Sequence, residues 1–345
     1  MQNIKIYRFT TGLLVVVAAL YVIPKVLNMA LYTPMDYPFV YYSSGLNELV
    51  EIDYSDKNYP MTSTKTRQKY STAECDSLMP VLNYRQLMSD GTAPDTIMGV
   101  AVDMRTIAAG RVVFRQSPST FENSLPKLHT LFESMPLRVG LTVPDDFFRL
   151  TDKIEFIDAR SNEIDVAKSE RYNNALLKKG FTFPAQWSNG NPSARKPYDE
   201  GYFSLDAEGQ LFHIKMVNGV PFIKNTLLSD SLEIEHFAIC EVANRRFYGF
   251  VFDKQGDVYV LLRGEGVYTP LKLDIPHFDI RTQQLLVMGD LFYWTVSVTD
   301  KEGKKFYALT NEELKQIDSY EVPCQQNLGQ SVHNFLQYVE GLMKN

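Results

Sequence analysis

The densest group of side chains that could bind or react is the hexapeptide Arg195-Lys-Pro-Tyr-Asp-Glu200. It places two cations and two carboxylates within six residues, shortly after Trp187 in a polar, turn-rich passage. Loops mounted on a rigid sheet are where binding residues gather. We therefore take Trp187, Arg195, Lys196, Tyr198, Asp199 and Glu200 as the first candidate site, for contact with a ligand or a partner. The alternative, which we favour, is a surface loop whose charges satisfy one another.

A second group consists of Tyr84, Arg85 and Asp90. Ser71-Thr-Ala-Glu74 matches a capping box, and the apolar spacing behind it predicts a helix that ends at Asp90-Gly91, with a break allowed at Pro80. Arg85 lies on a helix otherwise suited to a core, so it must reach a carboxylate or the surface. Structural pairing is favoured here, and ligand recognition is the alternative.

The signatures of common catalytic and metal centres are missing from the sequence. None of the five histidines forms an i, i+4 pair or an HExxH motif, and the three cysteines are far apart. There is no Gly-x-Ser-x-Gly elbow, no Walker loop and no dinucleotide fingerprint. We therefore expect a protein that is not an enzyme and has no metal or cofactor. The three cysteines could form one disulfide, or all three could be buried thiols, and the sequence does not decide between these alternatives.

Length, composition and net charge limit the class of protein to which the chain can belong. The 345 residues are 45% hydrophobic and 22% charged, which is typical of a globular chain of one large domain or two modest ones. A net charge of −6 without a basic stripe argues against nucleic-acid binding.

A repeated Asp-x-x-Gly motif predicts the strands and loops that would position the candidate site residues. Asp206-Ala-Glu-Gly209, Asp253-Lys-Gln-Gly256 and Asp300-Lys-Glu-Gly303 have their aspartates 47 residues apart, and each separates two runs of aromatic and β-branched residues. A weaker copy without glycine begins at Asp158. Asp opening a turn and Gly in the left-handed position are typical of a hairpin loop, which we prefer to a calcium site. The period is that of a β-propeller blade.

Other segments complete the predicted order. They are a hairpin over 39–52, a loop over 53–69, two short strands within 97–115 around Ala108–Gly110, a helix over 120–134, a strand over 137–143, a helix over 165–179, the repeats over 202–322 and an amphipathic helix over 328–343 packed on the domain.

The amino terminus predicts a membrane anchor. Residues 9–32 are mostly apolar, and they reach the roughly 20 residues of a spanning helix if Lys25 extends to the far interface. Lys5 and Arg8 before this stretch place residues 1–8 in the cytoplasm and 33–345 outside it. The alternatives are a cleaved signal peptide and a buried core helix.

Two passages carry a family resemblance. Met79-Pro-Val-Leu-Asn-Tyr-Arg-Gln-Leu-Met-Ser-Asp-Gly91, with Pro94-Asp95, is one, and Gly190 to Phe203 running into Leu211–Lys215 is the other. The chain resembles an uncharacterised bacterial family of membrane-anchored proteins, a domain of unknown function whose genes tend to lie beside ABC-transporter components. The resemblance implies association with a transporter and assigns no activity.

The sequence thus predicts a mainly β protein of propeller-like repeated antiparallel sheets with inserted helices, held by one transmembrane helix in the inner membrane with its bulk in the periplasm. The expected function is that of a non-enzymatic accessory or scaffold subunit of a membrane complex, with ABC-transporter permease subunits as expected partners. A periplasmic ligand-binding or sensor module and a periplasmic hydrolase are the alternatives.

Overall fold

The computed structural model describes residues 2–32, 35–121, 128–138, 140–324 and 328–344. The chain divides into two compact units, each treated by itself below. The β unit comprises residues 39–298 and 306–320. The helical unit comprises residues 1–38, 299–305 and 321–345, and so includes the tips of three strands named below.

Antiparallel strands form five sheets of three to five strands and one two-stranded ribbon in the described ranges. The sheets are β1 (Phe39–Ser43), β2 (Glu48–Ile52), β3 (Met61–Ser63) and β4 (Lys69–Tyr70); β8 (Asp146–Leu150), β9 (Ile154–Asp158) and β10 (Ile164–Asp165); β11 (Trp187–Gly190), β12 (Tyr202–Leu205), β13 (Leu211–Val217) and β14 (Val220–Asn225); β15 (Ile234–Ile239), β16 (Phe247–Asp253), β17 (Val258–Arg263) and β18 (Tyr268–Lys272); and β19 (Gln284–Gly289), β20 (Tyr293–Thr299), β21 (Gly303–Thr310) and β22 (Gln316–Pro323), joined at β19 by β7 (Val112–Gln116). The ribbon is β5 (Thr96–Ile97) with β6 (Val100–Ala101).

Helices of the β unit connect or flank these sheets. They are α2 (Thr72–Leu78), α3 (Tyr84–Ser89), α4 (Met104–Gly110), α5 (Pro118–Phe121), α6 (Val166–Lys178) and the 3-10 helix η1 (Leu228–Asp230). Ser71 caps α2 with the predicted capping box, and Asp165 caps α6. The predicted helix over 71–90 is split between α2 and α3 at Met79-Pro80, because proline cannot donate a backbone hydrogen bond within a helix.

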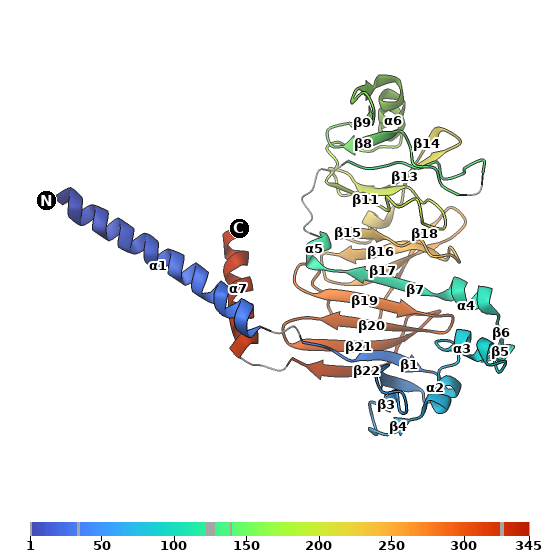
Figure 1. The fold of residues 1–345 in the computed structure, drawn as a ribbon. Helices are drawn as coiled ribbons and strands as arrows, with labels where there is room; N and C mark the ends of the chain where they lie inside the picture. The colour runs from blue at the N-terminus through green and yellow to red at the C-terminus, as the bar shows by residue number, and fades with distance from the viewer. Residues whose placement is uncertain (1, 33–34, 122–127, 139, 325–327, 345) are drawn as a thin grey trace. The chain divides into compact units, whose positions relative to one another are not determined.

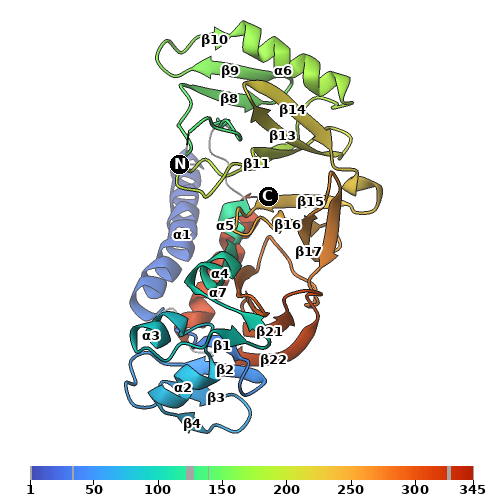
Figure 2. The same cartoon turned by 90° about the vertical axis from the view of Figure 1, so that its right-hand side faces the viewer.

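Successive sheets of the β unit pack face to face. Figures 1 and 2 show them in the order β8–β10, β11–β14, β15–β18, β7 with β19–β22, and β1–β4. Separate apolar clusters fill the spaces between neighbours: Phe156 with Phe212, Phe203 with Phe237, and Phe114 with Phe250. All seven residues of β16 are buried because it lies between two sheets. A strand covered on both faces reads as a continuous apolar run.

The repeated Asp-x-x-Gly motif forms the loops between β12 and β13, between β16 and β17, and between β20 and β21. Gly209, Gly256 and Gly303 have φ of 79°, 81° and 152°. Asp206 Oδ1 accepts hydrogen bonds from the backbone N–H of Glu208 and Gln210, at 2.9 and 2.8 Å. In the weaker copy, Asn162 takes the left-handed position with φ 58°. The carboxylates therefore close hairpin loops, as predicted.

The mainly β class with several antiparallel sheets is confirmed. No closed propeller is present among the sheets of the described residues.

Three predicted elements differ from the structure. Residues 104–110, expected to connect two strands, form α4, which Asp103 caps through the Thr106 N–H. The strand expected at 137–143 is absent from its described residues, where Gly140 has φ 96°, and β8 begins at Asp146 instead. Of the helix expected at 120–134, Thr120 and Phe121 belong to α5, residues 122–127 lie outside the described residues, and 128–134 are not helical.

The helical unit contains α1 (Gln2–Leu31) and α7 (Leu328–Lys344). The rings of Tyr32 and His333 stack at a centroid distance of 3.8 Å, and His333 Nδ1 lies 3.1 Å from Asn28 Oδ1. The amphipathic segment predicted to pack on the β domain thus contacts α1. In the part of the chain that the structure describes, no helix meets the length and apolarity needed to cross a membrane.

Candidate functional site

The first candidate loop is the hairpin connection between β11 and β12. Those strands pair from Trp187 with Leu205 to Gly190 with Tyr202, and residues 191–201 form the loop between them. Lys196, Tyr198, Asp199 and Glu200 are buried, whereas Arg195 is exposed. Most of the predicted charges therefore point into the protein.

Lys196 is fully enclosed by acceptors. Its Nζ lies 2.5 Å from Asp199 Oδ1, 2.7 Å from the Asn191 carbonyl oxygen and 3.3 Å from Glu241 Oε1. The side chains of the three charged residues are 0–1% exposed. A buried ammonium is tolerated only when paired and hydrogen-bonded, and this one has both kinds of partner.

The two carboxylates around Lys196 also bind the backbone. Asp199 Oδ2 accepts from the Gly201 N–H at 3.0 Å and from Ser134 Oγ. Glu241 Oε1 accepts from the Glu200 N–H at 2.8 Å, and its Oε2 accepts from Asn191 Nδ2 at 2.8 Å. Burial raises the pKa of Glu241, and Lys196 opposes that change. The carboxylates fix the backbone where the loop enters β12.

Glu200 is the centre of the other half of the cluster. Its carboxylate forms ion pairs with Arg263 at the end of β17 and, at 3.1 Å, with Lys215 of β13. The side chains of Lys215 and Arg263 are partly exposed, at 17% and 29%. We call Lys196, Asp199, Glu200, Lys215, Glu241 and Arg263 the charge cluster; its three formal positive and three formal negative charges balance.

His213 lies beside the charge cluster as a neutral imidazole. Its Nε2 is 2.7 Å from the Glu200 carbonyl oxygen and its Nδ1 is 2.8 Å from Tyr268 Oη. A carbonyl can only accept, so Nε2 carries the proton and Nδ1 accepts from the tyrosine. Burial lowers the pKa of His213 to about 3; the bond to Glu200 opposes this, and the positive charges of Lys215 and Arg263 reinforce it.

This depressed pKa predicts a dependence of stability on pH. In the unfolded chain His213 takes up a proton below about pH 6.5, but in the folded protein only near pH 3. Stability is therefore lost as the pH falls through this window, by at most about 1.4 kcal/mol per pH unit. In denaturant unfolding between about pH 6 and pH 4, His213→Gln is expected to show a shallower loss than the parent. If the free energy of unfolding fell equally steeply with pH in the parent and in His213→Gln, His213 would not be the neutral buried imidazole described above.

Arginine side chains cover Tyr198 at the edge of the charge cluster. The guanidinium carbons of Arg245 and Arg263 lie 4.3 and 5.9 Å from its ring centroid, and burial raises the pKa of Tyr198 to about 12. Trp187 is half-buried and its ring lies 5.6 Å from that of His236. The exposed Arg195 follows Ser193, whose Oγ accepts from its backbone N–H at 3.1 Å. Arg195 is therefore the charge that this loop presents to solvent.

The second predicted group does not join the first. Tyr84 is buried in a separate apolar cluster with Ile97 and Val102, and its Oη donates to the Val102 carbonyl at 3.2 Å. Arg85 and Asp90 are exposed, and Asp90 accepts from Gln86 Nε2 at 3.0 Å. Figures 1 and 2 place α3 and β11 at well-separated levels of the stack. Tyr84 supports the local fold, whereas Arg85 reaches the surface and does not form the buried pair that the sequence favoured.

Sequence reasoning missed Lys215, Glu241, Arg263 and His213. The first two lie 15 and 41 positions from Glu200 and Arg263 lies 63 away, so no local spacing links them to the loop. The sequence of β13 did contain one indication of the charge cluster. His213 and Lys215 are polar residues at alternate positions of the otherwise apolar β13, which places them on one face of the sheet.

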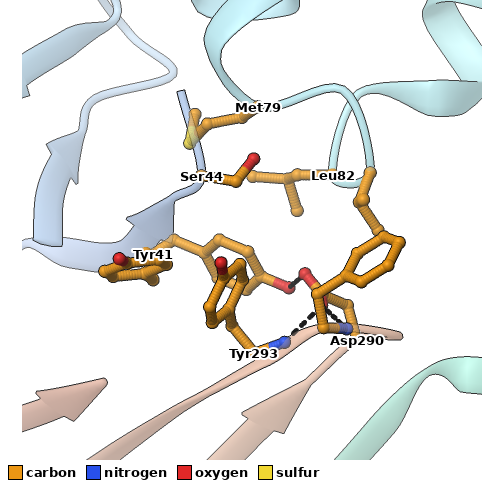
Figure 3. Close-up of a pocket in the computed structure, with 9 residues that line it drawn as sticks. Tyr41, Ser44, Met79, Leu82, Asp290 and Tyr293 are labelled. Atoms are coloured by element: carbon orange, nitrogen blue, oxygen red, sulfur yellow. Dashed lines mark hydrogen bonds between the residues drawn. The ribbon is translucent and has the colours of Figure 1, made fainter. Parts of the chain in front are cut away.

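A small cavity lies between β1 and the β19–β20 turn (Figure 3). Its volume is about 10 Å³, close to the minimum for a single water. Asp290 in its wall accepts from Tyr41 Oη at 3.1 Å and from the N–H groups of Phe292 and Tyr293 at 2.8 and 2.9 Å. Burial raises the pKa of Asp290. These bonds close a turn and anchor β1, and they leave no room for a substrate.

A larger surface cavity of about 320 Å³ lies near His277. Arg281 in its wall pairs with Glu235, and Asp279 accepts from the Arg281 N–H at 2.9 Å and from Thr282 Oγ1 at 2.7 Å. His277 Nδ1 lies 2.8 Å from the Gln255 carbonyl oxygen. These polar groups stabilise the rim of the cavity itself and do not converge on a bound molecule.

The described residues also lack an arrangement typical of a metal site. They contain no group of three or more His, Cys, Asp and Glu side chains placed to hold a metal ion. Cys75 and Cys240 carry free thiols, and burial raises the pKa of Cys240 to about 12. A thiol with a raised pKa is a poor nucleophile.

The comparisons with known proteins give a family without an activity. No curated protein and no solved structure shows significant similarity to the chain. Residues 39–309, from β1 to the penultimate residue of β21, match a domain of unknown function, DUF4857. This match includes the whole charge cluster and most of the sheets. The chain therefore belongs to the DUF4857 family.

Proposed function

We propose that the protein is a non-enzymatic accessory or scaffold subunit of a membrane complex, with α1 as its anchor and the β unit outside the cytoplasm. The observation that carries the scaffold role is the balanced charge cluster. Its charges satisfy one another inside the fold, so the 191–201 loop keeps its shape without a ligand. A preorganised loop binds a partner without first losing conformational entropy.

The membrane location is supported by the amino-terminal sequence. The run from Gly12 to Ile23 is apolar without interruption, and two basic residues precede it. The transporter is proposed as the partner because of the resemblance carried by residues 79–95 and 190–215. The loops of the repeated hairpins would provide the contact surfaces.

Recovery of partners from native membranes tests this proposal. The full-length chain, solubilised in mild detergent, is expected to bring down transporter subunits that mass spectrometry identifies. Arg195→Glu reverses the exposed charge of the loop; a loss of about 1.4 kcal/mol in the contact would reduce recovery about tenfold.

Arg160→Glu is the matched control, because Arg160 is also an exposed arginine and lies in the β9–β10 loop. It is expected to recover partners as the parent does. Parent protein that recovers no membrane subunit would argue against the accessory role. Equal recovery with both variants would remove the 191–201 loop from the interface.

A further inference from the structure

The carboxyl-terminal helix α7 has one side committed to α1. Gly329 lies so close that a Cβ there would be 2.1 Å from the Leu31 carbonyl oxygen. His333 stacks on Tyr32 four residues further on, and Leu336 is 6% exposed. Residues three and four apart share a helix face. This face, which Gly329, His333 and Leu336 define, fixes the rotation of α7 about its axis.

A neighbouring face of α7 is apolar and uncovered. Leu328, Phe335 and Tyr338 are 70%, 52% and 66% exposed. Their spacing of seven and three residues places them on one side of the helix, and the same spacing puts Val332 and Val339 on that side. Gln330 and Asn334, which are joined by a hydrogen bond of 3.1 Å from Gln330 Nε2 to Asn334 Oδ1, fall on the remaining side.

The helix that α7 contacts, α1, also exposes large apolar side chains. Figure 1 shows α7 beside the carboxyl-terminal end of α1, where Asn28 and Tyr32 contact His333. Large apolar side chains of α1 are exposed on several sides of the helix: Val15, Val22, Ile23, Val26, Leu27, Met29 and Leu31. A groove in another protein would cover one side of such a helix. At about 100° per residue these positions cover somewhat more than half of the helix circumference, which is a broader surface than a groove encloses but one that lipid can cover.

We propose that α7 lies in the membrane–water interface, with Leu328, Phe335 and Tyr338 inserted into lipid and its polar side toward water. This inference rests on the membrane location in the proposed function. Aromatic side chains are favoured at that depth, and an amphipathic helix in the interface buries its apolar side about 5–10 Å below the headgroups. Because α7 carries few basic residues, the driving force is apolar burial, and a neutral lipid suffices.

Quenching of tryptophan fluorescence by brominated lipid tests the proposal. The full chain is reconstituted into phosphatidylcholine vesicles with brominated acyl chains, and the signal of the native Trp187 and Trp294 is subtracted using the parent. Phe335→Trp and Tyr338→Trp report on the apolar face, Gln330→Trp reports on the polar side, and Val15→Trp reports on α1. We expect at least twofold stronger quenching at positions 335 and 338 than at position 330.

Two results would overturn it. Equal quenching at 330, 335 and 338 with strong quenching at Val15→Trp would remove α7 from the lipid and leave α1 as the anchor. Absence of quenching at all four positions would remove both helices from the membrane. Failed recovery of transporter subunits, by contrast, concerns the partner alone. Circular dichroism of each variant confirms that it is folded before quenching is compared.

Discussion

Lys196→Met is expected to destabilise the protein by about 3–5 kcal/mol. The methionine keeps most of the volume but removes the cation, so Asp199 and Glu241 remain buried without the ion pair that they share. The Asn191 carbonyl also loses its 2.7 Å hydrogen bond. Urea unfolding, monitored by intrinsic tryptophan fluorescence, measures the change, and Trp187 reports from the start of the same hairpin.

Arg195→Met is the matched control, because it removes an adjacent cation of similar length that is exposed. A surface change of this kind is expected to alter stability by no more than about 0.5 kcal/mol. A Lys196 variant that unfolds at the same urea concentration as the Arg195 variant would show that the ion pairs contribute nothing to the fold.

Gly201→Ala is expected to destabilise the protein by about 4 kcal/mol or more. Gly201 has φ 64°, and a Cβ at this position would lie 2.2 Å from the Ile214 carbonyl oxygen. The neighbouring strand β13 cannot withdraw without breaking its pairing with β12. The displacement would also weaken the bond from the Gly201 N–H to Asp199 Oδ2.

Gly209→Ala separates the two causes of that loss. Gly209 has φ 79°, but no atom lies within 4 Å of a Cβ built there. Only the left-handed conformation is unfavourable for alanine, at about 1–2 kcal/mol. Thermal and denaturant unfolding of both variants measures the difference. Equal losses would contradict the close approach of Gly201 to β13.

Local patterns predicted the parts of the fold that local interactions determine. The capping box at Ser71 and the Asp-x-x-Gly loops were found because both partners lie within four residues. The α4 helix was not predicted although Asp103 caps it, because Ala108–Gly110 was interpreted as a turn between two short strands. The packing of α7 on α1 joins residues about 300 positions apart, and no spacing in the sequence indicates it.

The candidate site shows the same division. The sequence indicated that residues 195–200 would satisfy their own charges, and within the loop Lys196 does pair with Asp199. The remaining partners, among them Arg263 of β17 and Glu241 between β15 and β16, come from distant segments and could be identified only once the sheets were placed. The orientation could not be predicted either. Residues 195–200 were expected to face solvent, whereas four of these six residues are buried because the β11–β12 hairpin lies between two sheets.

Hydrogen exchange at residue resolution is the most direct test of the claim that this loop is a fixed part of the sheet stack. The Glu200 N–H donates to Glu241 and the Gly201 N–H donates to Asp199. Both amides should therefore exchange as slowly as those of β12 and β13, and Lys196→Met should accelerate both. Exchange of these two amides in the parent at the rate of an unprotected loop would contradict the account.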